Sequence, residues 1–221
     1  MHADNHQSDP RWTDLRQEMV QTQLIGRGIR DPHVLEAMAA LPREEFVPPG
    51  QRPAAYEDCA LPVGPGQTIS QPYIVAYMTE KLALAPGHRV LEVGGGTGYQ
   101  AALLSMLGGD VVSVERDAQL VRAAQERLSL LNIKGVRFHC GDGSMGFSPS
   151  APFDRIIVTA GAPHVPPTLV EQLVEGGRMI VPVGSASQQV VVCVIRHGHG
   201  TTEYPLLPCR FVKLVGEQGW D

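Results

Sequence analysis

The sequence lacks most of the features that mark membrane, secreted and nucleic-acid-binding proteins. No run of about eighteen apolar residues occurs, so we expect no membrane partner. The first residues lack the basic-then-apolar order of a secretion signal, and we expect a cytoplasmic protein. Only 18 lysine and arginine residues stand against 23 aspartate and glutamate residues. The resulting net charge of −5 argues against a nucleic-acid partner, which would require a basic face.

Cysteine and metal-binding patterns are also scarce. The four cysteines include no CxxC pair, and the eight histidines include no HExxH motif. In a cytoplasmic chain we expect the cysteines to be free thiols. His197 and His199 form an H-x-H, but glycines accompany them between two apolar runs, which predicts a solvated turn. We therefore expect no metal site.

The first part of the chain reads as helices around one long irregular segment. Apolar spacing predicts helices over 11–27, 32–41 and 73–84. Residues 48–72 are rich in proline, glycine and polar side chains, which predicts a long loop. Such loops in compact domains are usually functional or disordered, and the stretch Gln67–Pro72 favours function here.

From residue 89 onward the pattern alternates between strand and helix. Expected strands lie at 89–93, 111–115, 136–140, 156–159 and 178–182, and expected helices at 99–107, 117–131 and 166–174. Residues 189–195 and 210–215 then follow one another without a helix, which predicts an antiparallel pair. The predicted fold class is α/β, a doubly wound, mostly parallel seven-stranded sheet with helices on both faces and an N-terminal helical extension.

The length of 221 residues suits one domain, and we expect a monomer. Within residues 1–221 we expect a disordered start over 1–10. Residues 11–85 would form the N-terminal helices and a substrate or lid segment. Residues 86–221 would form the α/β core that binds a cofactor.

A glycine-rich turn follows the first expected core strand. Glycines at 94, 96 and 98 let the backbone approach a ligand more closely than a side chain would allow. Glu115 ends the next strand, where a carboxylate can accept hydrogen bonds from both ribose hydroxyls. Asp142 follows the third strand and can accept from an adenine amino group. Together these strand ends predict an adenosine site.

The glycine spacing distinguishes between adenosine cofactors. A dinucleotide fingerprint with Gly94 and Gly96 in register requires a third glycine at position 99, where Tyr99 stands. The G-x-G-x-G pattern suits S-adenosylmethionine, which has no pyrophosphate to place. No P-loop motif occurs. The residues alone therefore indicate a methyltransferase of unknown substrate.

Several separate segments resemble one family more specifically. They are LPREEFVP at 41–48, GQTISQPYIVAYMTE at 66–80, VLEVGGGTGYQAALL at 90–104, GDG at 141–143, FDRIIVTAGAP at 153–163, EGGRMIVPVG at 175–184 and CRFVKLVG at 209–216. Over roughly residues 16 to 216 the chain resembles the bacterial type of the protein-L-isoaspartate O-methyltransferase family. Gly95, Gly161 and Lys213 depart from the expected pattern, but none removes a polar group that the chemistry needs.

The resemblance implies a Rossmann-like methyltransferase fold and a repair reaction. The implied substrates are L-isoaspartyl residues in damaged peptides and proteins, whose free α-carboxylate takes a methyl group from S-adenosylmethionine. S-Adenosyl-L-homocysteine is the implied product. The methyl ester closes to a succinimide, and part of the succinimide hydrolyses to normal aspartate.

The resemblance also implies roles for individual residues. Ser70 is the expected catalytic residue, orienting the substrate carboxylate through its hydroxyl. The expected cofactor-binding residues are Thr68, Ile69, Glu92, Gly94, Gly96, Thr97, Gly98, Glu115, Arg116, Asp142 and Gly143. The expected substrate-binding residues are Ser70, Gln71, Tyr73 and Val212.

Three alternatives stay open on the sequence alone. Ser70 could instead cap the helix that begins near Pro72, a position that serine favours. The chain could methylate a small molecule or RNA on the same fold. It could also be a non-catalytic module that binds an adenosyl cofactor.

Overall fold

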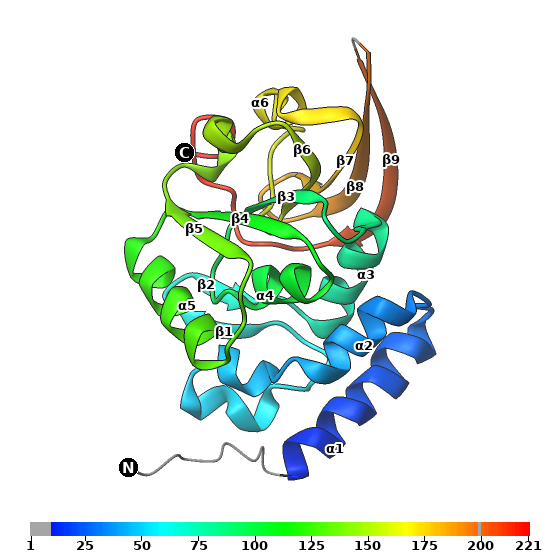
Figure 1. The fold of residues 1–221 in the computed structure, drawn as a ribbon, viewed down its shortest axis with the longest axis vertical. Helices are drawn as coiled ribbons and strands as arrows, with labels where there is room; N and C mark the ends of the chain where they lie inside the picture. Colours follow the sequence, from blue (N-terminus) through cyan, green and yellow to red (C-terminus); the bar gives the residue numbers. More distant parts are fainter. Residues whose placement is uncertain (1–9, 199) are drawn as a thin grey trace.

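The centre of the molecule is a parallel sheet built from alternating strands and helices (Figure 1). The computed structural model describes residues 10–198 and 200–221. The strands are β3 (Arg89–Val93), β4 (Asp110–Glu115), β5 (Val136–Cys140), β6 (Phe153–Val158) and β7 (Leu173–Gly184). The helices between them are α4 (Tyr99–Met106), α5 (Ala118–Leu130), the short 3-10 turns η5 (Gly143–Met145) and η6 (Ser148–Ser150), and α6 (Pro167–Glu171).

The strand order places a topological switch point between β3 and β6. The seven strands run in the order β5-β4-β3-β6-β7-β8-β9, and β3 pairs in parallel with both β4 and β6. The hairpin of β8 (Gln189–His197) and β9 (Gly200–Cys209) adds two antiparallel strands to one edge. In sheets of this kind, ligands bind where the strand order reverses, beyond the carboxyl ends of the strands. The predicted fold class is confirmed.

Buried side chains alternate between the two faces of the sheet. Val90 and Val111 lie in one apolar cluster with residues of α3 and α4. Leu91 and Val112 lie in the cluster on the other face, against α6 and the C-terminal segment. Because both faces are covered, the central strands read as nearly continuous apolar runs in the sequence.

The N-terminal part packs across the end of this core (Figure 1, blue to cyan). Its elements are α1 (Pro10–Glu18), the π-helical turn η1 (Met19–Leu24), η2 (Ile25–Arg27), α2 (Pro32–Ala40), η3 (Arg43–Phe46), η4 (Pro49–Ala54), the hairpin β1 (Leu61–Gly64) and β2 (Gln67–Ile69), and α3 (Pro72–Leu82). The Asp31 carboxylate caps α2 by accepting from the His33 and Val34 backbone N–H groups. No helix of the described ranges is long and apolar enough to cross a membrane.

The first expected helix, over 11–27, is only partly α-helical. It widens to a π turn from Met19, where the Thr22 hydroxyl donates to the Glu18 carbonyl at 2.8 Å. Gly28 then ends the segment in a left-handed conformation. Pro10, expected within the disordered start, is the first helical residue, and residues 1–9 lie outside the described range.

Three further expectations for the secondary structure were wrong. Residues 48–72 hold the β1–β2 hairpin, which Gly66 closes at φ +67°, instead of a wholly irregular loop. The helix expected over 166–174 ends at Glu171, because Leu173 already pairs with Phe153 of β6. The strand expected over 210–215 is replaced by β9, because the turn at Gly198 folds the chain directly back along β8.

The turn at the end of the β8–β9 hairpin matches the prediction in part. His197 ends β8 and Gly198 has a left-handed φ, as expected of a turn, while His199 lies outside the described residues. The four cysteines are free thiols, as predicted.

Phe46 joins the N-terminal part to the core. Its side chain has no exposed surface, and its ring meets the Tyr99 ring edge-on with centroids 5.1 Å apart. Tyr99 belongs to α4, directly after the glycine turn. Burying a large aromatic side chain and adding an edge-to-face contact both stabilise this junction.

We predict that Phe46→Ala lowers the free energy of unfolding by about 3–5 kcal/mol, because it leaves a cavity at a buried aromatic pair. Urea unfolding followed by circular dichroism measures this change. Leu130→Ala is the control, since Leu130 is 84% exposed, and it should change stability by less than about 0.5 kcal/mol. Equal effects from the two substitutions would contradict the proposed junction.

Candidate functional site

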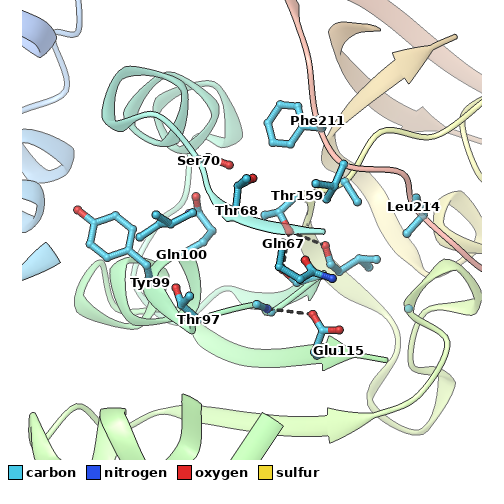
Figure 2. Close-up of a pocket in the computed structure, with 18 of the residues that line it drawn as sticks. Gln67, Thr68, Ser70, Thr97, Tyr99, Gln100, Glu115, Thr159, Phe211 and Leu214 are labelled. Atoms are coloured by element: carbon cyan, nitrogen blue, oxygen red, sulfur yellow. Dashed lines mark hydrogen bonds between the residues drawn. The ribbon is translucent and has the colours of Figure 1, made fainter. Parts of the chain in front are cut away.

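A cavity opens at the carboxyl ends of β3, β4 and β6 (Figure 2). Its walls come from three parts of the chain. Residues of β2 and α3 form one wall, and the ends of the parallel strands form the floor. The extended segment Phe211–Val215 forms the third wall. The cavity therefore lies at the switch point, where the fold predicts a ligand.

The glycine turn brings main chain, rather than side chains, to the cavity floor. Gly94 has φ +92°, and its N–H donates to the Val114 carbonyl at 2.9 Å. The Thr159 hydroxyl donates to the Gly94 carbonyl at 2.5 Å across the switch point. A Cβ at position 94 would lie 2.6 Å from that hydroxyl oxygen, so both space and conformation require glycine.

Glu115 presents its carboxylate at the end of β4. One oxygen accepts from the Gly96 N–H at 3.0 Å (Figure 2). The other oxygen accepts from the Asp117 N–H, also at 3.0 Å. Each oxygen retains acceptor capacity, because a carboxylate has about four lone-pair sites. The side chain lines the cavity and is oriented by main-chain groups. This geometry suits acceptance from two vicinal hydroxyls.

Glu92 lies behind the glycine turn and does not line the cavity. Its side chain is fully buried and accepts from the hydroxyl of Ser113, its neighbour across the β3–β4 pair. Burial raises the pKa of Glu92 to about 8; the Ser113 hydrogen bond opposes this rise, and the Glu115 charge adds to it. A Cβ at Gly95 would lie 2.5 Å from the Ser113 hydroxyl oxygen. The Glu92–Ser113 pair therefore supports the turn from beneath.

Asp142 holds the C-terminal turn. One carboxylate oxygen accepts from the Ser144 N–H and hydroxyl, and the other accepts from the Glu217 N–H at 2.8 Å. Burial raises the pKa of Asp142, but the hydrogen bonds from Glu217 and Ser144 outweigh it, so the pKa lies below its usual value. The neighbouring Gly143 lines the cavity, whereas the Asp142 side chain lies outside its lining. The predicted contact of Asp142 with adenine stays a prediction.

Ser70 lies in the cavity wall between β2 and α3. Gln71, not Ser70, is the N-cap residue of α3, and no side chain caps that helix. Among the described residues the Ser70 hydroxyl has no hydrogen-bond partner within the protein. Figure 2 shows the Ser70 and Thr68 hydroxyls facing the gap toward Phe211. The helix-capping alternative for Ser70 is therefore excluded.

The expected substrate residues are divided between the cavity and the surface. Val212 lines the cavity. The Gln71 amide donates to the Asp58 carboxylate and carbonyl at 2.9 and 3.0 Å, away from the cavity lining. Tyr73 packs beneath the Arg27 guanidinium, 3.7 Å from its ring centroid. Roles for Gln71 and Tyr73 stay predictions.

The structure thus brings most of the predicted site together. The predicted residues that line the cavity are Thr68, Ile69, Ser70, Gly94, Gly96, Thr97, Glu115, Arg116, Gly143 and Val212. Those outside its lining are Gln71, Tyr73, Glu92, Gly98 and Asp142. Sequence reasoning did not assign Tyr99, Gln100, Thr159, Phe211, Lys213 and Leu214, which also line it. Thr159 directly follows a buried strand, so the strand-end rule could have found it.

The fold and this cavity define the S-adenosylmethionine-dependent methyltransferase class. The floor suits an adenosyl group, since the glycine turn brings main chain to the cavity and Glu115 offers an oriented carboxylate. The family model for protein-L-isoaspartate(D-aspartate) O-methyltransferase matches residues 15–219. This chain belongs to that family.

Relatives with similar sequences match nearly the whole chain. A protein-L-isoaspartate O-methyltransferase 2 of Pelobacter propionicus is 53% identical over 93% of this chain and 92% of its own length. A protein-L-isoaspartate O-methyltransferase of Methanoregula boonei is 47% identical over 95% of this chain and 96% of its own length.

Solved structures of similar proteins superpose on most of this chain. A protein-L-isoaspartate O-methyltransferase structure superposes with a TM-score of 0.83 at 36% identity, covering 92% of this chain and 67% of that one. A Plasmodium falciparum relative in complex with S-adenosyl-L-homocysteine has a TM-score of 0.77 at 26% identity, covering 90% of this chain and 98% of that one. The predicted family, activity and cofactor are confirmed: the chain is an S-adenosylmethionine-dependent protein-L-isoaspartate O-methyltransferase.

The buried Glu92 predicts a pH-dependent stability. Its folded-state pKa of about 8 exceeds the ordinary value of 4.5, so the folded protein binds more protons than the unfolded chain between these values. The contribution of Glu92 to stability is therefore fully present below pH 4.5 and is lost as the pH rises toward 8.

We predict that Glu92→Gln gains stability relative to the parent between pH 5 and pH 8. The gain should exceed about 1 kcal/mol, since one pKa unit corresponds to about 1.4 kcal/mol. Denaturant unfolding at several pH values measures the difference. Glu126→Gln, at an exposed site on α5, is the control and should show no such trend. A pH-independent difference for Glu92→Gln would disprove the assignment.

Proposed function

We propose that the cavity binds S-adenosylmethionine on its floor and aligns an isoaspartyl α-carboxylate from the side of Ser70. The observation that carries this proposal is the position of the Ser70 hydroxyl in the wall opposite the glycine turn, without a hydrogen bond to any of the described residues. The cofactor supplies an electrophilic methyl group on a sulfonium. The residues of this chain bind, orient and exclude water.

The proposed cofactor residues act mainly through main-chain groups and one carboxylate. Gly94, Gly96 and Thr97 would admit the ligand closely, and Glu115 would accept from the ribose hydroxyls. Gly143 would lie along the adenine. Glu92 would act indirectly, by holding Ser113 beneath the turn.

Ser70 is proposed to donate a hydrogen bond to the substrate carboxylate. A carboxylate with an ordinary pKa of about 4 is already ionised at neutral pH, so the reaction requires no strong base. A neutral hydroxyl orients the nucleophile without neutralising its charge. Catalysis then comes from holding the carboxylate and the methyl group in line.

Apolar side chains around Ser70 support the exclusion of water. Ile69, Phe211 and Leu214 line the same cavity, and Val212 would meet the peptide main chain. A drier cavity strengthens the hydrogen bond from Ser70 and removes competing donors.

Substitutions of Ser70 and Glu115 should affect different properties, the first catalysis and the second cofactor binding. We predict that Ser70→Ala lowers kcat for an isoaspartyl peptide by about 10–100-fold, because one orienting hydrogen bond is lost, while affinity for S-adenosyl-L-homocysteine stays within about threefold. Glu115→Gln should instead weaken that affinity by about 10–100-fold, because charged hydrogen bonds are lost. Methyl-transfer assays and isothermal titration calorimetry measure the two quantities.

Ser129→Ala, at an exposed site on α5, is the matched control for Ser70→Ala. The assay should include the normal aspartyl peptide, which should not be methylated. A folded Ser70→Ala enzyme that methylates the isoaspartyl peptide at the parental rate would remove Ser70 from the mechanism.

We also propose that residues 11–221 form one domain, with residues 11–85 covering the substrate side and 86–221 the cofactor side. Apolar residues of both parts belong to one buried cluster, which supports a single domain. We further propose a cytoplasmic monomer that binds no nucleic acid. The net charge of −5 supports the last of these points, because a nucleic-acid partner would require a basic face.

Light scattering after size exclusion should give the mass of one chain, 23.9 kDa, with or without added RNA. A dimer mass, or a shift on adding RNA, would contradict this proposal.

A further inference from the structure

Arg43 is a buried cation outside the cavity lining. It lies in η3 (Arg43–Phe46), and its side chain has no exposed surface. Within the part of the chain that the structure describes, no carboxylate forms an ion pair with it. Burying an arginine in this way is unfavourable unless its N–H groups find partners.

The Arg43 guanidinium donates to two main-chain carbonyls and lies over one aromatic ring. Its Nε donates to the Ala55 carbonyl and its Nη2 donates to the Ser70 carbonyl, each at 2.7 Å. The guanidinium carbon lies 5.0 Å from the ring centroid of Tyr99, which lines the cavity. Nη1 has no partner in the described structure. The planar fork of an arginine suits this paired donation, which a lysine ammonium cannot reproduce.

A second arginine, Arg127, connects η3 to the glycine turn on the cofactor side of the cavity. Arg127 of α5 donates from Nε to the Glu45 carbonyl at 2.7 Å and from Nη1 to the Thr97 carbonyl at 2.8 Å. The Phe46 ring also packs edge-on against Tyr99. Arg127 thus links the main chain of η3 to the glycine turn, while Arg43 of η3 contacts the Ser70 main chain.

Other anchors near Ser70 act on its neighbours. The β1–β2 pairing ends at Ile69, and the Gln71 side chain is fixed to Asp58 on the surface. Arg43 contacts the main chain of Ser70 itself, from the interior.

We propose that Arg43 is a positioning residue that sets the Ser70 hydroxyl in register with the bound methyl donor. The hydrogen bond to the Ser70 carbonyl fixes the main chain from which that hydroxyl projects. This inference rests on the role proposed above for Ser70. Displacements of about 1 Å in a reacting geometry can cost about 100-fold in rate.

A double-mutant cycle of Arg43→Lys and Ser70→Ala tests the inference. Arg43→Lys keeps the charge but loses the paired donation, and it should lower kcat by about 10–100-fold. The KM for the cofactor and the affinity for S-adenosyl-L-homocysteine should stay within about threefold. In the Ser70→Ala background, Arg43→Lys should lower kcat by less than about threefold, because both changes remove the same contribution.

Arg16→Lys is the matched control. Arg16 is also buried in the N-terminal part, but its guanidinium contacts Glu44, Tyr56 and the Ala40 carbonyl rather than Ser70. Arg16→Lys should lower the midpoint of thermal unfolding. At a temperature where Arg16→Lys and Arg43→Lys are both folded, Arg16→Lys should leave kcat within about threefold of the parental value.

Each outcome of the cycle is decisive. Additive losses, an equal kcat loss in Arg16→Lys, or a parallel loss of cofactor affinity would overturn the role of Arg43 while leaving that of Ser70 intact. A parental rate for Ser70→Ala would instead show that the Ser70 proposal fails, and the inference with it. Non-additive loss confined to kcat would support both.

Discussion

The contact between the ends of β3 and β6 is the constraint on which the site depends. The Thr159 hydroxyl reaches the Gly94 carbonyl across the switch point, and the left-handed turn at Gly94 leaves no room for a side chain. This contact holds the ends of the two strands together, and the glycine turn beside it brings main-chain groups to the cavity floor. Glu115 acquires its orientation from the same turn, because its carboxylate accepts from the Gly96 N–H. A cofactor on this floor would therefore be recognised by groups that the fold has already placed.

The N-terminal extension completes what the parallel sheet cannot supply. The sheet offers strand ends on one side of the cavity, whereas the Ser70 wall comes from a hairpin and α3. These two sides belong to distant parts of the sequence and need a rigid connection. Phe46 and Arg127 supply it on the cofactor side, and Arg43 supplies it on the substrate side. Orientation of two reactants demands this kind of shared frame, because each must be fixed relative to the other.

Strand-end logic and local motifs could predict much of this arrangement. The glycine turn and Glu115 follow from a repeating pattern in which the carboxyl ends of the parallel strands lie on the same side of the sheet. The C-terminal segment could not be placed in this way. Phe211–Val215 has the apolar composition of a strand, but the turn at Gly198 gives that pairing position to β9. Arg43 also escapes prediction, since an arginine in a charged stretch reads as exposed and its partners are main-chain carbonyls far along the chain.

The two neighbouring glutamates show why residue type alone does not assign a role. Glu115 is the last residue of β4 and Glu92 is the last but one of the adjacent β3, yet Glu92 is buried beside Ser113 while Glu115 reaches the cavity. Glu92 is paired with Ser113, and Glu115 lies two residues beyond Ser113 on β4, so both glutamates project from the same face of the sheet and differ in how close they lie to the strand ends. Burial then favours the protonated form of Glu92 near neutral pH, which spares the site a second negative charge beside Glu115. One carboxylate can thus serve recognition because the other is kept away from the ligand.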